Sequence, residues 1–162
     1  MPKAIADRLK KTNETISIDN PEISVLFADI VNFTVMSEKL SAENIVGFLD
    51  DMFSKFDELT EKYEVEKIKT IGDAYMVVTG LTSENRSHAA ILFEFGQELL
   101  KIASNYKDHK GEPITLRIGI NSGPAVSGVI GKSKFSFDIW GDTINTAARL
   151  ESYGVPSRIH MS

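Results

Sequence analysis

The hydrophobic positions of the chain alternate between short, strand-like runs and longer helical repeats. The run ISVLFADIV (residues 23–31) is rich in β-branched side chains and has the length of a buried strand. Residues 64–80 predict two strands joined by a turn at Ile71-Gly72. Three further segments also predict strands: PITLRIGINSG (113–123), which ends in a turn, the glycine-interrupted PAVSGVIG (124–131), and RIHM (158–161).

Helical periodicity is clearest after Ser41, a residue type that is favoured at a helix N-cap. Apolar side chains then recur on one helical face up to about Lys62: Ile45, Leu49, Met52, Phe53, Phe56 and Leu59. Residues 84–106 predict a second long helix, and residues 140–153 predict a third. Two residues are candidates for the N-cap of this third helix, Asp142 and Thr143.

The order of these elements, β-α-β-β-α-β, predicts an α+β fold of the ferredoxin-like type, with helices on one face of an antiparallel or mixed sheet. We expect the main domain to span residues 21–162. Residues 1–20, with a short basic helix within residues 1–13, are expected to be the remnant of a linker. Because the sequence stops inside a predicted strand, the domain is expected to lack its last strands.

Composition narrows the possible partners. The 162 residues carry a net charge of −5, which argues against nucleic acid because phosphate binding needs a basic surface. An acidic protein can still bind a nucleotide when a metal ion supplies the positive charge. The absence of cysteine excludes disulfides and thiolate metal sites. No apolar run reaches transmembrane length, so we expect a cytoplasmic domain, whose parent protein could still be anchored to a membrane.

Two aspartates stand out from this pattern. Asp29 lies within the most hydrophobic strand, where a carboxylate needs a partner, and Asp73 follows Gly72 at the tip of the predicted hairpin. Backbone N–H groups could satisfy the first, and ordinary turn chemistry could explain the second. If the strand and the hairpin are neighbours, however, the two carboxylates lie side by side. They then suit Mg²⁺ or Mn²⁺ together with substrate phosphates.

Four further polar residues form two candidate pairs. Lys69 can donate to N1 of adenine and Asp138 can accept from its N6 amino group, a pattern that leaves unpaired groups against guanine. Asn145 and Arg149 are four residues apart and share a helical face, and the arginine fork suits a phosphate. Without further context, an exposed helical face with a salt bridge to Glu151 or a neighbour is the better explanation of Asn145 and Arg149.

Four separated motifs together resemble the class III nucleotidyl cyclases, the catalytic domains of adenylate and guanylate cyclases. The resemblance covers nearly the whole chain from about Glu22. The motifs are FADIVNFT (27–34), EKIKTIGDAYMVV (66–78), LRIGINSGPAVSGVIG (116–131) and FDIWGDTINTAARLES (137–152). The resemblance implies a cyclase homology domain preceded by a linker that couples it to an upstream sensor or regulatory domain.

The resemblance also implies a role for each candidate residue. Two metal ions, Mg²⁺ or Mn²⁺, would be held by Asp29, Asp73 and the backbone of Ile30, with the turn at Phe33 and Thr34 near the triphosphate. The remaining roles fall to four residues: Lys69 and Asp138 for the base, Asn145 for the ribose and Arg149 for the pentacoordinate phosphate. In the family the metal aspartates of one subunit meet the other four residues of its partner in a head-to-tail dimer.

These roles imply a homodimeric adenylate cyclase that converts ATP to 3′,5′-cyclic AMP and pyrophosphate. Three alternatives are weighed: a guanylate cyclase, a domain that binds nucleotide or dimerises without turnover, and a diguanylate cyclase, whose Gly-Gly-Asp/Glu-Glu-Phe hairpin turn is not found here. The chain departs from the family pattern at Asn32, where glycine is frequent. It also departs at Pro124, expected in a turn where some members carry an arginine, and in the missing final strands with their phosphate-contacting lysine.

Overall fold

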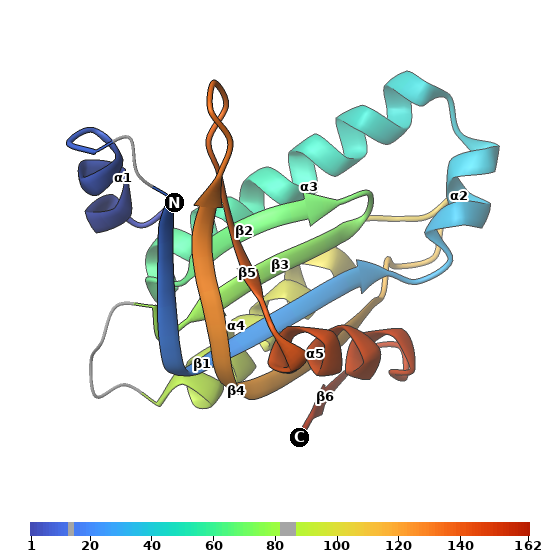
Figure 1. Ribbon diagram of the computed structural model, residues 1–162. Helices are drawn as coiled ribbons and strands as arrows, with labels where there is room; N and C mark the ends of the chain where they lie inside the picture. The colour runs from blue at the N-terminus through green and yellow to red at the C-terminus, as the bar shows by residue number, and fades with distance from the viewer. Residues whose placement is uncertain (13–14, 82–86) are drawn as a thin grey trace.

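The computed structural model describes residues 1–12, 15–81 and 87–162. Its centre is a six-stranded sheet in the order β2-β3-β1-β4-β5, with β6 paired to β4 (Figure 1). The strands are β1 (Ile16–Ile30), β2 (Glu66–Ile71), β3 (Ala74–Thr79), β4 (Leu116–Ile130), β5 (Ser136–Trp140) and β6 (Arg158–Met161). The helices are α1 (Lys3–Leu9), α2 (Phe33–Lys39), α3 (Ala42–Tyr63), α4 (His88–Ser104) and α5 (Asp142–Ser152).

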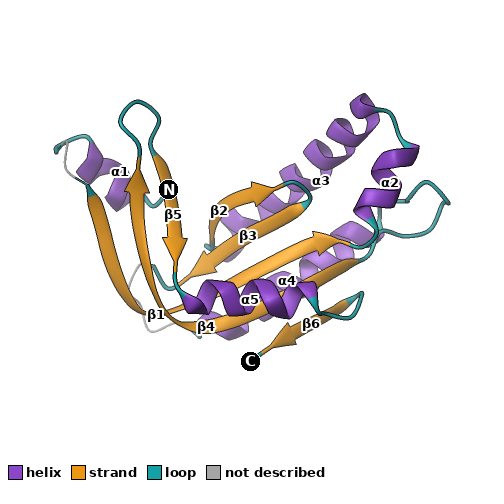
Figure 2. Ribbon diagram, turned by 45° about the vertical axis from the view of Figure 1, so that its right-hand side comes forward, coloured by secondary structure: helices purple, strands orange, loops and turns teal. Residues whose placement is uncertain are grey.

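The predicted α+β fold class is confirmed, and the sheet is mixed. Neighbouring strands run antiparallel, except that β4 and β6 are parallel. Strand β4 is long enough to serve two partners on one side, because residues 117–120 pair with β6 and residues 126–130 pair with β5. Figure 2 shows that the sheet is curved, with β5 beside β4.

The helices cover both faces of the sheet, which corrects the expectation of a single helical layer (Figures 1 and 2). Side chains of β1 alternate between the faces, as the two-residue period of a strand requires. Leu26, Ala28 and Ile30 join the core formed with α3 and α4, whereas Ile23, Val25 and Phe27 pack in a second cluster with α5. The face opposite α3 and α4 is apolar in β1, so it also needs a cover, and α5 supplies it.

Two strands are longer than predicted. Strand β1 begins at Ile16 rather than residue 23, and its first residues pair with residues 125–129 of β4. Residues 16–20 therefore belong to the sheet rather than to a linker. Strand β4 runs through Pro124 without the expected turn. The glycine interruption marks a close approach of backbones, because a Cβ atom on Gly128 would lie 2.7 Å from the carbonyl oxygen of Ile16.

The helix ends and the last strands differ from the sequence pattern in detail. The predicted N-cap at Ser41 is confirmed, since its side chain accepts a hydrogen bond from the Asn44 N–H group. Helix α5 is capped instead by Gly141, and Trp140 belongs to β5, a strand that was not predicted. The predicted start of the second long helix at residue 84 lies outside the described residues. No helix in the described ranges is long and apolar enough to cross a membrane.

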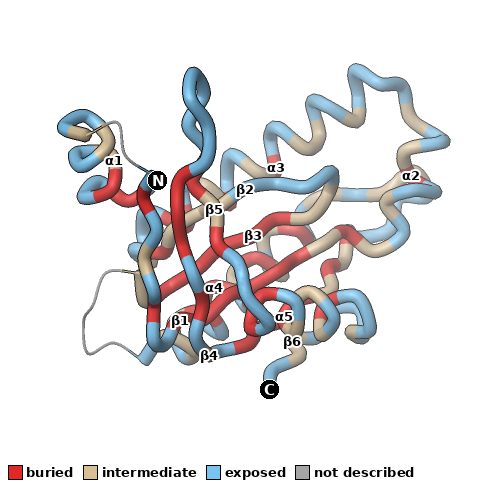
Figure 3. The backbone as a smooth tube through the Cα atoms, viewed as in Figure 1, coloured by how far each residue is buried: buried red, intermediate tan, exposed pale blue. Residues whose placement is uncertain are grey.

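The buried side chains form a band along the middle of the sheet, and its ends are more exposed (Figure 3). Tyr75, Phe56 and Phe95 are the largest fully buried side chains, and all lie between the sheet and the layer of α3 and α4. The polar groups described next therefore sit at the edge of a rigid core.

Candidate functional site

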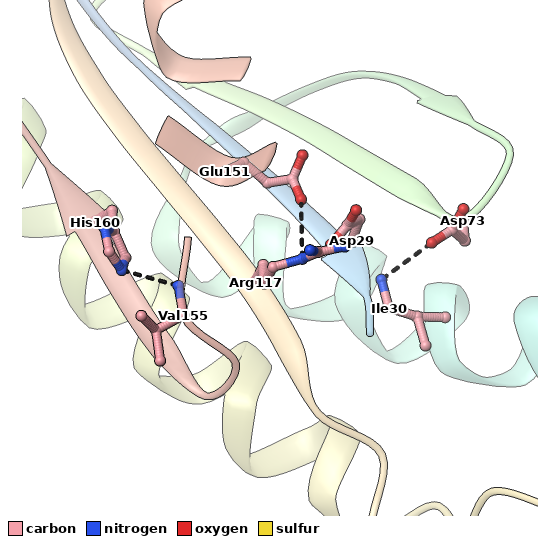
Figure 4. Close-up of polar contacts among 7 residues, drawn as sticks. All are labelled: Asp29, Ile30, Asp73, Arg117, Glu151, Val155 and His160. Carbon is pink, nitrogen blue, oxygen red and sulfur yellow. Dashed lines mark hydrogen bonds and ion pairs between the residues drawn. The ribbon is translucent and has the colours of Figure 1, made fainter. Parts of the chain in front are cut away.

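The two aspartates that stood out in the sequence lie close together at one end of the sheet. Asp29 is the penultimate residue of β1, and Asp73 lies in the turn between β2 and β3, after Gly72 with its positive φ of 59°. Because β1 pairs with β3 up to Ala28–Tyr75, the turn is held beside the end of β1. The backbone N–H of Ile30 donates to Asp73 Oδ2 at 3.1 Å (Figure 4).

Two further charged residues, which the sequence analysis did not select, complete this cluster. Arg117 stands directly opposite Asp29 in the β1–β4 register, and its Nε lies 3.4 Å from Asp29 Oδ1. Glu151 comes from α5, and its Oε1 lies 3.9 Å from the same Nε atom. Figure 4 shows Arg117 between the two carboxyl groups. Two features of the sequence could have indicated these residues. Arg117 is a charged residue within the apolar alternation of LRIGI, and Glu151 is in line with the apolar Ile144 and Ala147 on α5.

Burial shapes the electrostatics of the cluster. Burial raises the pKa of Asp73 above its ordinary value, although the hydrogen bond from the Ile30 N–H group favours the charged form. Burial also raises the pKa of Glu151 to about 8, and the nearby Asp29 carboxylate acts in the same direction. Glu151 Oε1 has no hydrogen-bond partner among the described residues. The cluster thus concentrates acidic groups around a single guanidinium.

The donors at this end of the sheet fit a hard divalent cation. Asp29 and Asp73 offer carboxylate oxygens, and the backbone of Ile30, the last residue of β1, lies beside Asp73. Among the residues that the structure describes, no group of three or more acidic, histidine or cysteine side chains could hold a metal ion alone. Mg²⁺ is usually bound by one or two carboxylates, water and substrate phosphates, and this donor set matches that pattern.

The turn after β1 has the conformation that its sequence suggested. Asn32 adopts a left-handed conformation with φ of 58°, which asparagine tolerates better than most residues, and it caps α2. Phe33 and Thr34 are the first residues of that helix. Thr34 is exposed and Phe33 is half-buried against the main core. The segment 30–34 thus leads directly from the carboxylate pair to a helix N-terminus.

Lys69 and Asp138 form a contact that sequence spacing alone could not establish. Lys69 Nζ lies 2.6 Å from Asp138 Oδ2, and Asp138 Oδ1 accepts a hydrogen bond from the N–H of Ile139. Lys69 belongs to β2 and Asp138 to β5, which occupy opposite edges of the strand order. The curled sheet therefore brings its two edge strands close enough to join a cation and a carboxylate. Asp138 lies on this strand, shortly before α5 begins at Asp142.

Asn145 and Arg149 share the exposed face of α5, as their spacing predicted. Arg149 Nη2 lies 3.4 Å from Thr146 Oγ1 and 3.6 Å from Asp142 Oδ1, so its recorded contacts stay within its own helix. Glu151 is on the other side of α5, where it is buried against the sheet. One helix therefore presents Glu151 to the aspartate cluster and Asn145 and Arg149 to the outside.

The fold and the polar clusters define a nucleotidyl cyclase type of catalytic domain. It is a curled α+β sheet with one carboxylate at the end of its first strand, a second in the neighbouring hairpin turn, and a Lys/Asp pair across its edges. The chain belongs to the family described as the adenylate and guanylate cyclase catalytic domain, which matches residues 17–162.

Relatives of both substrate types are similar to this chain. An adenylate cyclase of Mycobacterium tuberculosis (strain H37Rv) is 43% identical over 153 residues, covering 94% of this chain and 34% of the relative. The guanylate cyclase soluble subunit beta-2 of Rattus norvegicus is 39% identical, covering 100% of this chain and 24% of the relative. The chain thus spans about a third or less of the length of these curated relatives.

A solved structure supports the same fold. The catalytic core of a rhodopsin-guanylyl cyclase with converted specificity, in complex with ATPαS, superposes with a TM-score of 0.85 and 37% identity. The match covers 92% of this chain and 81% of that chain. The confirmed fold class therefore extends to a cyclase catalytic core.

Proposed function

We propose that this domain is an adenylate cyclase that converts ATP to 3′,5′-cyclic AMP and pyrophosphate. The observation that carries the proposal is the contact of Lys69 Nζ with Asp138 Oδ2 at 2.6 Å. It brings one donor and one acceptor side by side, as the N1 and N6 positions of adenine would require. Guanine presents an acceptor and a donor in the reverse order, and a mismatch would leave polar groups unpaired. The 43% identical mycobacterial relative is also an adenylate cyclase.

Each proposed role follows from what the side chain can do. Lys69 and Asp138 bind the base, Asn145 orients the ribose, and Arg149 places positive charge on the phosphate as it becomes pentacoordinate. Asp29, Asp73 and the Ile30 carbonyl would hold Mg²⁺ or Mn²⁺. When bound, these ions supply charge neutralisation of the triphosphate and acidify the attacking hydroxyl. Phe33 and Thr34 lie at the turn that would face the phosphates.

A guanylate cyclase is the second candidate, because the rat subunit aligns over the whole chain at 39% identity. The printed description of the rhodopsin-guanylyl cyclase core states that its specificity was converted and that it holds ATPαS. Base choice can therefore change within this fold. In the present chain the proposed base-binding residues are a lysine and an aspartate, which favours adenine.

We further propose that two copies of the chain share two active sites. Asn145 and Arg149 are on the exposed side of α5, facing away from the sheet that carries Asp29. A partner with two-fold symmetry would receive them and would return the same residues, since such an interface is self-complementary. The proposal leaves residues 1–15 as a linker from a sensor or regulatory domain of the full-length protein.

The first experiment measures cyclic nucleotide formation from ATP and from GTP with Mg²⁺ or Mn²⁺. The wild-type chain is expected to prefer ATP. Replacing Lys69→Glu together with Asp138→Cys should abolish that preference and allow GTP to react, because glutamate can accept from guanine N1–H and N2. Retained preference for ATP in a folded double variant would show that the base is read elsewhere. Preference of the wild type for GTP would favour the second candidate.

The second experiment mixes two inactive variants, Asp29→Ala and Arg149→Ala. Each alone damages both sites of its own dimer. In a mixed dimer one site collects both lesions and the other collects none. Random pairing makes about half of the dimers mixed, so about a quarter of wild-type activity should return. No recovery after demonstrated subunit exchange would place the complete site within one subunit.

A further inference from the structure

Arg117 has no role in the proposed chemistry, yet it occupies the middle of the acidic cluster. Its side chain is 32% exposed, and it points along the α5 face of the sheet towards Asp29 (Figure 4). The cross-strand register Asp29–Arg117 fixes where both side chains start. Their meeting is therefore set by the sheet and not by a mobile loop.

Glu151 is a second carboxyl neighbour of Arg117, at the same Nε atom that faces Asp29. Its Oε1 lies 3.9 Å from the Arg117 Nε, and its side chain is 9% exposed. It reaches this position because α5 lies almost on the backbone of β4. A Cβ atom on Gly119 would meet the Glu151 backbone nitrogen at 2.3 Å and the Ala147 carbonyl oxygen at 2.5 Å. The absence of a side chain at Gly119 is what allows Glu151 to approach the cluster.

The contact with Arg117 places the two oxygens of the Asp29 carboxylate in different environments. Oδ1 faces the guanidinium at 3.4 Å, so Oδ2 remains for another ligand. The neighbouring Asp73 is also held by the backbone, since its Oδ2 accepts from the Ile30 N–H group. Each aspartate thus has one oxygen held by the protein. Outer contacts of this kind orient ligating carboxylates, and their loss commonly weakens metal affinity 10- to 100-fold, roughly.

We propose that Arg117, held between Asp29 and Glu151, is a positioning residue that fixes the Asp29 carboxylate for divalent-cation binding. This inference rests on the proposed function for the assignment of Asp29 as a metal ligand. A competing effect has the opposite sign, because a guanidinium beside the site repels a cation. The proposal states that orientation outweighs repulsion, and metal affinity therefore decides between the two.

The test titrates the whole chain with Mn²⁺ alone and follows free Mn²⁺ by its electron paramagnetic resonance signal. Arg117→Gln is expected to raise the Kd about 10- to 100-fold. Arg117→Lys keeps the charge but loses the planar fork, so it should recover only part of the affinity. Arg158→Gln is the matched control. Arg158 is the β6 register partner of Arg117 and is exposed. Its replacement by glutamine removes the same charge without changing a contact to Asp29.

Each outcome has one reading. Binding by folded Arg117→Gln that equals or exceeds wild type overturns the proposal and shows that Arg117 acts by repulsion. An equal loss in Arg158→Gln also overturns it, because the general field would then be responsible. If Arg117→Gln does not fold, Arg117→Lys decides, and an unchanged Kd in that variant overturns the proposal.

An activity readout separates positioning from general damage to the fold. In Arg117→Lys the Mn²⁺ concentration for half-maximal turnover should rise, while turnover at saturating Mn²⁺ stays within about threefold of wild type. Asp29→Asn separates the two proposals. Wild-type Mn²⁺ affinity in that variant refutes Asp29 as a ligand and overturns both. Metal binding that depends on Asp29 and Arg117, without any cyclic nucleotide product, refutes only the proposed function.

Discussion

The two faces of the sheet are built from the same strands but differ in the side chains that they present. On the side of α3 and α4, successive inward residues of β1 are apolar to the end, as in Leu26, Ala28 and Ile30. On the side of α5, the apolar series Ile23, Val25 and Phe27 ends in Asp29. One face is therefore a continuous core, and the other changes from core to charged cluster along a single strand.

The contrast shows how a stable core can support an expensive polar cluster. Buried charges cost free energy unless they are paired, and the cluster around Asp29 has one guanidinium for its several carboxyl groups. The fully packed opposite face holds β1 and β4 in register, so the charged side chains cannot separate to relieve their repulsion. The difference predicts that substitutions on one face change stability and those on the other change chemistry.

The largest expected effect is on turnover. Asp29→Asn keeps the shape of the side chain and removes the charge that would balance the cations, so cyclase activity should fall about 10³-fold or more. The free energy of unfolding should change little, because the repulsion from nearby carboxyl groups and the attraction to Arg117 are lost together. Steady-state kinetics and urea denaturation measure the two quantities. The control is Asp19→Asn, an exposed aspartate on the same strand, which should leave turnover unchanged. Near-normal turnover in folded Asp29→Asn would contradict the functional difference between the two faces of the sheet.

The matching change on the other face should act on stability. Leu26 is fully buried, and Leu26→Ala should lower the free energy of unfolding by about 2–5 kcal/mol because it removes packed volume from the main core. Below the unfolding transition, the remaining folded protein should keep the wild-type preference between ATP and GTP. Denaturant titration combined with the two-substrate assay tests this. A changed base preference with little loss of stability would contradict the division between the faces.

The smallest expected effect sharpens the contrast through pH. Burial raises the pKa of Glu151 to about 8, above its ordinary value of 4.5, so the folded state retains a proton that the unfolded state releases. The stability of the wild type should therefore fall as pH rises from 4.5 to 8. Glu151→Gln should remove that slope, measured as the difference from wild type in urea denaturation of metal-free protein. Glu94→Gln, at an exposed position on α4, should keep it.

The sequence predicted the parts of the fold that depend on local periodicity. The helix after Ser41, the hairpin before and after Gly72, and the apolar strand around Phe27 all follow from spacing that a strand or helix must show. The presence of a helix on the second face of the sheet was not predicted, because the periodicity of α5 does not say which face of the sheet it covers. Strand β5 was missed because its alternation is short and lies directly before a helix.

The candidate site divides in the same way. Asp29 and Asp73 could be selected because a carboxylate inside an apolar run, or after a turn glycine, is conspicuous in one dimension. Arg117 and Glu151 could not, since their importance lies in a cross-strand register and in a helix pressed against Gly119. The partner of Lys69 followed from the chemistry of adenine, while the approach of β2 to β5 follows only from the curl of the sheet.

The contact between Lys69 and Asp138 gives that curl a further consequence. It joins the two outermost strands of the path, which also contribute Ile68 and Phe137 to one apolar cluster, so the curled sheet is nearly closed here. Lys69 is 43% exposed, and exposed ion pairs contribute only about 0–1 kcal/mol. The ion pair is therefore weak enough for a base with matching donors and acceptors to replace it, or to bind both of its side chains, at little cost in free energy. The curvature of the sheet would then change when a base binds, because the same two side chains join the edge strands and contact the base.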